Sequence, residues 1–154
     1  MMDIRLYREM LEIDSTSGRE RALADFLAER LLTAYNKVER FDVEPMSADM
    51  SEGCGLPQNL LFSWGVPKVV FCTHLDTVPP YIPPTPFADG SEQQEWTVCT
   101  SAIHGRGTCD AKGQIFSMWE ACKALEAKGH DGFGLLLLAG EETGSYGAKA
   151  FREQ

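Results

Sequence analysis

"VVFCTHLDTVPP" at residues 69–80 is the stretch on which the predicted fold depends. Its first residues are β-branched or aromatic, which favours a buried β-strand, and the prolines at its end cannot continue one. The strand would therefore end at His74, closely followed by Asp76. In open α/β sheets, binding sites lie outside the carboxyl ends of the strands. A histidine and an aspartate at such an end indicate a functional site.

Strand signals occur at four places, and helical patterns separate some of them. The strands are expected at 37–44, 59–64, 68–74 and 133–140. Strands and helices alternate toward the C-terminus, which is typical of parallel βαβ units. The sequence therefore predicts an α/β protein, a three-layer sandwich whose mixed, mostly parallel central sheet is covered by helices on both faces. A proline-rich stretch between 79 and 100 is expected to be a long surface loop.

Four helices are expected from apolar residues at helical spacing. They cover residues 3–13, the segment after "STSGRE", residues 111–128 and a segment that starts at Ser145. Ser17 and Glu20 fit a capping box for the second helix. Asp110 is placed to cap the third helix, and Gly129 to end it.

The composition is typical of a soluble globular protein and argues against some partners. The 154 residues suffice for one domain, with 44% apolar and 24% charged residues. The net charge of -9 opposes binding to nucleic acid or to an anionic membrane. The 5 cysteines include no CxxC pair, which argues against a disulfide scaffold and a zinc ribbon. The N-terminus has no signal-peptide pattern, and we expect a cytoplasmic protein.

Ionisable residues occur at the ends of two predicted strands, and a further one lies in a glycine-rich turn. These residues are His74 and Asp76, then Asp110 in "GRGTCDAKG", then Glu141 and Glu142. If the three segments are neighbours, four carboxylates share one crevice and repel one another unless cations neutralise them. Imidazole with carboxylates is a ligand set suited to zinc, with manganese or cobalt possible. The sequence therefore predicts a metal site.

The spacing within each pair indicates different tasks. His74 and Asp76 are two apart on an extended segment, so the aspartate can accept the second imidazole N–H and fix the tautomer. Glu141 and Glu142 are adjacent, so their side chains diverge in an extended backbone. One of them can bind a metal while the other reaches the water or the substrate.

Each motif on its own has a simpler interpretation. A single His-x-Asp is mostly a structural pair, a Glu-Glu pair is usually a solvated turn, and Asp110 could be a plain helix cap. Phosphate binding by "GRGTCDAKG" is opposed by the acids that would face the anion. Cys72 and Cys109 are interpreted as small packing residues, and His104 and His130 as exposed bystanders. A non-catalytic binding module stays an alternative.

The ordered combination of "HLDTVPP", "GRGTCDAKG" and "LLLLAGEETGSYGAKAF" resembles the M20 family of metallopeptidases. The resemblance implies a zinc-exopeptidase-like fold with two zinc ions, one bound by His74, the other by Glu142, and both bridged by Asp110. It also implies that Asp76 orients His74 and that Glu141 is the general base. The family tends to hold the peptide bond after the bridging aspartate in cis.

The family completes its site with a further acidic ligand, a late histidine and a lid domain that often dimerises. The last predicted helix has no stop signal before Gln154. We therefore expect residues 1–154 to be the N-terminal part of a catalytic domain whose lid and C-terminal part are absent. The parent protein is expected to be a homodimer, whereas this chain alone would bind metal weakly and expose apolar surface.

The implied reaction is hydrolysis of an amide bond by a metal-activated water and a glutamate base. The motifs are most similar to those of acetylornithine deacetylase and succinyl-diaminopimelate desuccinylase, which implies N-acyl amino acids as substrates. A dipeptidase, aminoacylase or carboxypeptidase that acts on short peptides is the alternative.

Overall fold

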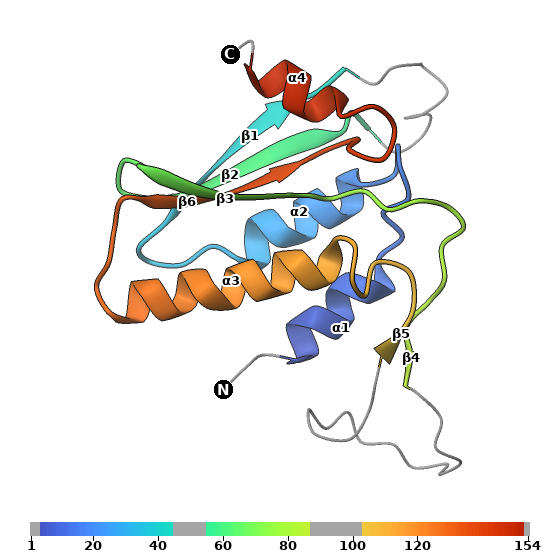
Figure 1. Cartoon of the computed structure of the whole chain (residues 1–154), viewed down its shortest axis with the longest axis horizontal. Coiled ribbons are helices and arrows are strands. Elements are labelled where there is room, and N and C mark those ends of the chain that lie inside the picture. The colour runs from blue at the N-terminus through green and yellow to red at the C-terminus, as the bar shows by residue number, and fades with distance from the viewer. Residues whose placement is uncertain (1–3, 45–54, 87–102, 153–154) are drawn as a thin grey trace.

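The computed structural model describes residues 4–44, 55–86 and 103–152, and its centre is a four-stranded β-sheet (Figure 1). The strands follow the order β1-β2-β6-β3 across the sheet. Their bounds are Lys37–Asp42 for β1, Gln58–Trp64 for β2, Val69–His74 for β3 and Phe133–Leu138 for β6. Two short strands, β4 (Thr85–Pro86) and β5 (Ile103–His104), pair separately. The four predicted strands are confirmed, with small differences at their ends.

The sheet contains both antiparallel and parallel pairs. β1 pairs with β2 and β2 with β6 in antiparallel orientation, whereas β3 and β6 are parallel. The predicted α/β class and mixed sheet are confirmed, but most pairs among the described strands are antiparallel. For the pair of β1 and β2 the reason is local, because these strands are consecutive and an antiparallel pair needs no crossover helix. β3 and β6, by contrast, are connected through α3 (Lys112–Ala127), as in a βαβ unit.

Helices cover both faces of the sheet (Figure 1). α1 (Ile4–Glu12), α2 (Arg21–Arg30) and α3 lie on one face, and α4 (Tyr146–Arg152) lies on the other. The main core lies between the first three helices and the sheet, and it includes Leu23, Leu27, Leu60, Phe62, Trp64, Ile115, Trp119, Leu135 and Leu137. A smaller apolar cluster beside α4 contains Val43, Ala139 and Tyr146. None of the described helices has the length and apolar character needed to cross a membrane.

Of the three helix ends predicted from capping or stop residues, one is confirmed and two are wrong. Gly129, with a φ of 74°, ends α3 as predicted. The predicted side-chain caps of α2 and α3 are wrong, because neither Glu20 nor Ala111, the observed N-cap residues, makes a side-chain capping hydrogen bond. Ser17 and Asp110 instead face the candidate site, where charged partners offer stronger hydrogen bonds than a neutral helix amide.

β3 is less buried than its sequence predicts. Val69 and Val70 are 61% and 43% exposed, because β3 is the last strand of the described sheet. His74 at its carboxyl end is buried. Cys72 and Cys109 are both exposed, so their interpretation as packing residues is wrong. Most of the predicted loop between 79 and 100 lies outside the described residues.

The packing around Gly140 leaves no room for a side chain, whereas the space around Gly129 is open, so Gly129 provides a control position. A Cβ at Gly140 would lie 1.9 Å from the ring of Tyr146, whereas nothing lies within 4 Å of a Cβ at Gly129. Both glycines have a positive φ. We expect Gly140→Ala to lower the free energy of unfolding by about 2–5 kcal/mol, from the left-handed backbone and an overpacked core. Gly129→Ala should cost about 1–2 kcal/mol. Urea unfolding measures the free energy of unfolding of both variants. Equal losses of stability would contradict the predicted steric clash with Tyr146.

Candidate metal centre

The carboxyl end of β3 positions His74, whose side chain is largely buried. Its Nδ1 lies 2.9 Å from the backbone oxygen of Asp76 and 3.3 Å from the carboxylate Oδ1 of the same residue. Its Nε2 lies 2.9 Å from Oδ1 of Asp110. Asp76 therefore fixes one side of the ring, and Nε2 faces the other acids of the site.

Asp76 is fully buried, and its carboxylate joins separate segments of the chain. Oδ1 accepts a hydrogen bond from the backbone N–H of Glu141 at 2.9 Å. Oδ2 accepts one from the backbone N–H of Glu142 at 3.2 Å and one from the hydroxyl of Ser17 at 2.8 Å. The predicted contact with His74 is present, and the contacts with Ser17 and the two amides are additional. Asp76 thus holds the turn after β6 next to the imidazole.

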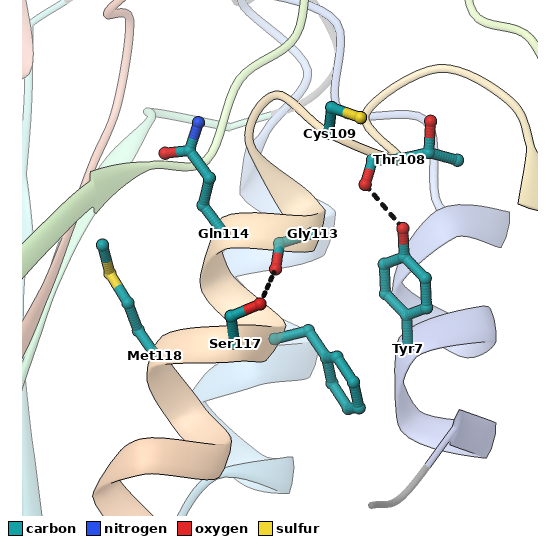
Figure 2. A pocket seen from close by; sticks show the side chains of 8 residues that line it. Tyr7, Thr108, Cys109, Gly113, Gln114, Ser117 and Met118 are labelled. Carbon is teal, nitrogen blue, oxygen red and sulfur yellow. Dashed lines mark hydrogen bonds between the residues drawn. The ribbon is translucent and has the colours of Figure 1, made fainter. Parts of the chain in front are cut away.

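The turn that carries Asp110 is held by α1 and by its own backbone. Tyr7 of α1 donates a hydrogen bond to the carbonyl oxygen of Thr108 at 2.6 Å, beside a pocket of about 530 Å³ (Figure 2). A Cβ on Gly113 would lie 2.1 Å from the same oxygen, so only glycine fits this close approach. The peptide bond between Asp110 and Ala111 is cis, as the family resemblance implies.

Gln114 connects the carboxylate of Asp110 to β3. Its side-chain amide donates a hydrogen bond to Oδ1 of Asp110 at 3.3 Å. Its amide oxygen accepts one from the hydroxyl of Thr73 at 2.8 Å. Thr73 directly precedes His74 in β3. Two neighbouring residues of β3 therefore orient the carboxylate of Asp110. His74 contacts it directly, and Thr73 acts through Gln114.

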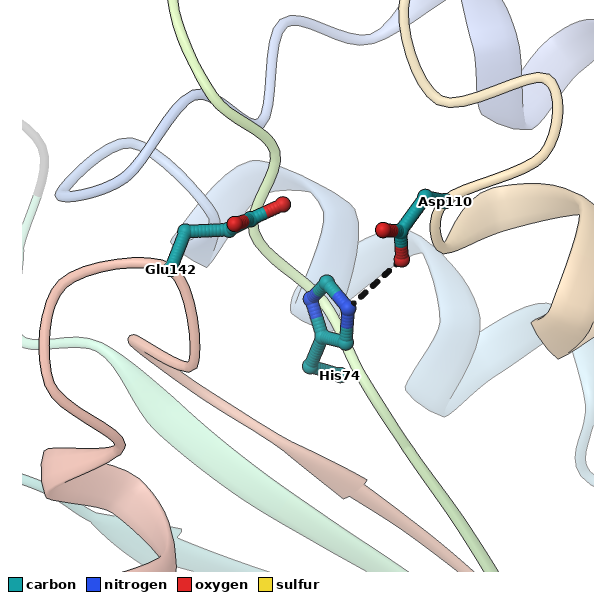
Figure 3. Close-up of side chains that lie close together, drawn as sticks. All are labelled: His74, Asp110 and Glu142. Atoms are coloured by element: carbon teal, nitrogen blue, oxygen red, sulfur yellow. Dashed lines mark hydrogen bonds and ion pairs between the residues drawn. The ribbon is translucent and has the colours of Figure 1, made fainter.

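Three side chains form a set that can hold a metal ion. One ligand atom from each of His74, Asp110 and Glu142 lies within 4.8 Å of the others, and the side chains converge (Figure 3). One imidazole and two carboxylates suit zinc or another divalent transition metal. The side chain of Asp110 is 64% exposed, so the set is open to water and substrate. Within residues 4–44, 55–86 and 103–152, it is the only such group.

The groups of the site shift one another's pKa values. Burial lowers the pKa of His74, but hydrogen bonds with Asp76 and Asp110 outweigh it and raise the pKa to about 9. Burial raises the pKa of Asp76, yet the hydrogen bonds it accepts, first that from His74, bring it below its ordinary value. Burial, followed by the charge of Asp110, raises the pKa of Glu142. The second effect, repulsion between Glu142 and Asp110, is one that an added positive charge would relieve.

The structure brings together all five residues that the sequence pattern indicates, which are His74, Asp76, Asp110, Glu141 and Glu142. Oε2 of Glu141 lies 4.0 Å from Nε2 of His74, and the Glu141 side chain is 49% exposed. His104 and His130 are exposed and do not belong to the group, as expected.

Ser17 and Gln114 contact the site, although the sequence motifs indicate neither of them as a site residue. Gln114 follows Asp110 by four residues at the start of a helix, and this i,i+4 spacing is the signal that could reveal it. Ser17 lies in "STSGRE", where the capping-box pattern gives it an ordinary explanation. No local signal connects it to Asp76, from which it is 59 residues away.

An α/β sandwich with an imidazole and several acids at the carboxyl ends of its strands is typical of metal-dependent hydrolases. The chain belongs to peptidase family M20/M25/M40, whose family model matches residues 70–154. The matched region contains His74, Asp76, Asp110, Glu141 and Glu142. The resemblance that the three motifs indicate is therefore confirmed.

Individual relatives agree with this family. A probable carboxypeptidase of Aspergillus fumigatus is 31% identical over an alignment of 157 positions, which covers 97% of this chain and 35% of that protein. The aminopeptidase PepT from Bacillus cereus is 28% identical with a TM-score of 0.66, and the match covers 96% of this chain and 38% of that structure. An M20 family metallo-carboxypeptidase from Sulfolobus solfataricus, 20% identical, shares the fold with a TM-score of 0.63 over 99% of this chain and 34% of its own. This chain thus spans little more than a third of the relatives it matches.

The raised pKa of His74 predicts a pH-dependent stability of the metal-free chain. Protonated His74 is stabilised by its carboxylate neighbours, so this contribution is complete below the ordinary pKa of 6.5 and is lost as the pH rises through about 9. We expect the free energy of unfolding to fall by about 3 kcal/mol over this range because of His74. Urea unfolding with a chelator present measures the change.

The variant His74→Asn is the control for this prediction. It lacks the titrating ring, so its stability should not show the fall that His74 causes. The same pH dependence in His74→Asn and the wild type would exclude His74 as its source.

Proposed function

We propose that this chain forms the metal-binding part of the catalytic domain of a zinc-dependent peptidase. The proposal depends on one observation, the approach of His74, Asp110 and Glu142 to within 4.8 Å at their ligand atoms. The two carboxylates repel each other at such a separation unless a cation lies between them. Membership in the M20/M25/M40 peptidase family supports the same function.

In this proposal His74, Asp110 and Glu142 would hold two zinc ions, with His74 as a ligand of one, Glu142 as a ligand of the other and Asp110 as a shared ligand, and cobalt or manganese could substitute. When bound, such ions polarise the carbonyl group of the substrate and lower the pKa of a water molecule. Asp76 has a different task, because hydrogen bonds already occupy both of its oxygens. It fixes the ring of His74 so that Nε2, rather than Nδ1, is available for coordination.

Glu141 is the proposed general base. Its backbone N–H is held by Asp76, while its carboxylate lies at the exposed edge of the ligand set, with Oε2 4.0 Å from Nε2 of His74. In the reaction Oε2 accepts the proton of the attacking water and later passes it to the nitrogen of the departing amine. The amide bond breaks, and the products are a carboxylic acid and an amine.

The proposed substrate is a short peptide. The relatives described above are named as carboxypeptidases and an aminopeptidase, which favours the peptidase alternative over an acetylornithine-deacetylase-like activity. The deacetylase prediction has no support from these relatives. Both reactions hydrolyse an amide, so the same ligands and the same base serve either one. The difference lies in the residues that contact the two ends of the substrate.

The proposal extends to the parent protein. Because the match covers 35% of the Aspergillus relative, we expect further residues to complete the catalytic domain. The family resemblance implies that they include a lid through which two subunits dimerise. A cytoplasmic location is supported by the free thiols of Cys72, Cys109 and Cys122.

Replacing Glu141 by glutamine tests its role as the base. Glutamine keeps the size of the side chain but cannot accept the proton, so kcat of the full-length enzyme should fall about 10²–10⁴-fold. The zinc content, measured by atomic absorption, should stay unchanged. Glu39→Gln is the matched control, because Glu39 lies on β1 at the opposite edge of the sheet. Undiminished turnover in Glu141→Gln would exclude this residue as the base.

Metal removal and a substrate panel test the class of reaction. Dialysis of the full-length enzyme against a chelator should abolish hydrolysis, and added zinc should restore it. The panel contains a free dipeptide, a free tripeptide, a dipeptide with a blocked N-terminus and N-acetylornithine. We expect cleavage of at least one peptide and none of N-acetylornithine, measured as released amine. A preference for N-acetylornithine would instead support the deacetylase.

A further inference from the structure

We infer that Ser17 is a positioning residue of the proposed metal site and acts through the buried carboxylate of Asp76. The inference rests on the proposed function, because the position of Asp76 matters for catalysis only if the site binds metal. Ser17 lies in the loop between α1 and α2, outside the residues 70–154 that match the family model.

Ser17 completes the set of groups that solvate Asp76. A carboxylate offers about four lone-pair positions. His74 Nδ1 and the N–H of Glu141 face Oδ1, whereas the N–H of Glu142 and the hydroxyl of Ser17 face Oδ2. The contact with the hydroxyl, at 2.8 Å, is shorter than the 3.3, 2.9 and 3.2 Å contacts of the other three. Asp76 has 0% exposure, so bulk water does not replace a lost donor.

The loop that carries Ser17 is fixed on two sides. On one side, the backbone N–H of Ser17 donates a hydrogen bond to the carbonyl oxygen of Thr77 at 3.1 Å, and the N–H of Thr77 donates one to the carbonyl oxygen of Ser15 at 2.9 Å. At the end of the loop, the buried side chain of Glu20 accepts a hydrogen bond from the hydroxyl of Tyr146 at 3.0 Å. These contacts set the position of the Ser17 hydroxyl independently of any metal, as a well-organised site requires.

The hydroxyl of Ser17 reaches the proposed ligands through the oxygen that it contacts. Oδ2 of Asp76 also accepts the backbone N–H of Glu142, and Oδ1 faces the ring of His74. A carboxylate that loses one of its donors can rotate. The backbone N–H of Glu142 and the ring of His74 would then lose the fixed position of Asp76, their shared partner. Hydrogen bonds that orient metal ligands in this way change metal affinity or activity by about 10–100-fold when they are removed.

Three variants of the full-length protein separate positioning from folding. Ser17→Ala removes the hydroxyl, and Ser17→Thr keeps it. Ser15→Ala removes a buried hydroxyl from the same loop, one that makes no hydrogen bond within the described structure. Each protein is titrated with Co²⁺, whose visible absorption reports affinity and ligand geometry. Each is also assayed for kcat and KM with a dipeptide.

We expect Ser17→Ala to weaken Co²⁺ binding or to lower kcat about 10–100-fold with KM unchanged, while Ser17→Thr and Ser15→Ala stay within about threefold of the wild type. If Ser17→Ala matches Ser15→Ala in both measurements, the inference is overturned, even when the variant melts at a lower temperature. Equal impairment of Ser17→Thr and Ser17→Ala would also overturn it. A wild type that binds Co²⁺ but cleaves no peptide contradicts the proposed function, and the Co²⁺ affinities then still decide the role of Ser17.

Discussion

A charged carboxylate without access to solvent is the constraint on which the candidate site depends. Removing an ionised carboxylate from water costs several kcal/mol, which only well-placed hydrogen bonds can offset. Asp76 obtains these bonds from the loop before α2, from the end of β3 and from the turn after β6. The need to solvate one buried charge therefore brings His74 and Glu142 close to each other. Hydrogen bonds within the protein thus help to set this arrangement.

The parallel pairing of β3 and β6 supplies the second part of the arrangement. In this register His74 lies opposite Leu138, so the chain leaves both strands at the same edge of the sheet. Asp110 comes from the turn before α3, and Gln114 connects it to β3 by hydrogen bonds. His74 thus lies at the end of a strand, and the other two proposed ligands lie in short turns next to α3 and β6. Short turns anchored on a strand or a helix hold such groups more precisely than long loops do.

The sequence is sufficient to predict those features that have a local signal. Runs of β-branched and aromatic residues reveal the strands, Gly129 reveals the end of α3, and acids that follow strands reveal the candidate metal site. The partners of these acids have no such signal. The letters of "STSGRE" fit a helix cap as well as they fit the contact of Ser17 with Asp76, and only the packing of distant segments decides between them. The exposure of Val69 likewise depends on the place of β3 in the sheet, which no local pattern encodes.

The contacts of Asp76 also determine when the site can form during folding. Ser17 precedes Asp76 by 59 residues, and Glu141 follows it by 65. Contacts between residues so distant in sequence form only after long loops have closed, which makes them slow. On the ribosome, the cluster cannot be completed before β6 and the turn behind it have emerged. A metal held by the proposed ligands would therefore bind after these segments have folded, in contrast to zinc fingers, in which the metal drives folding.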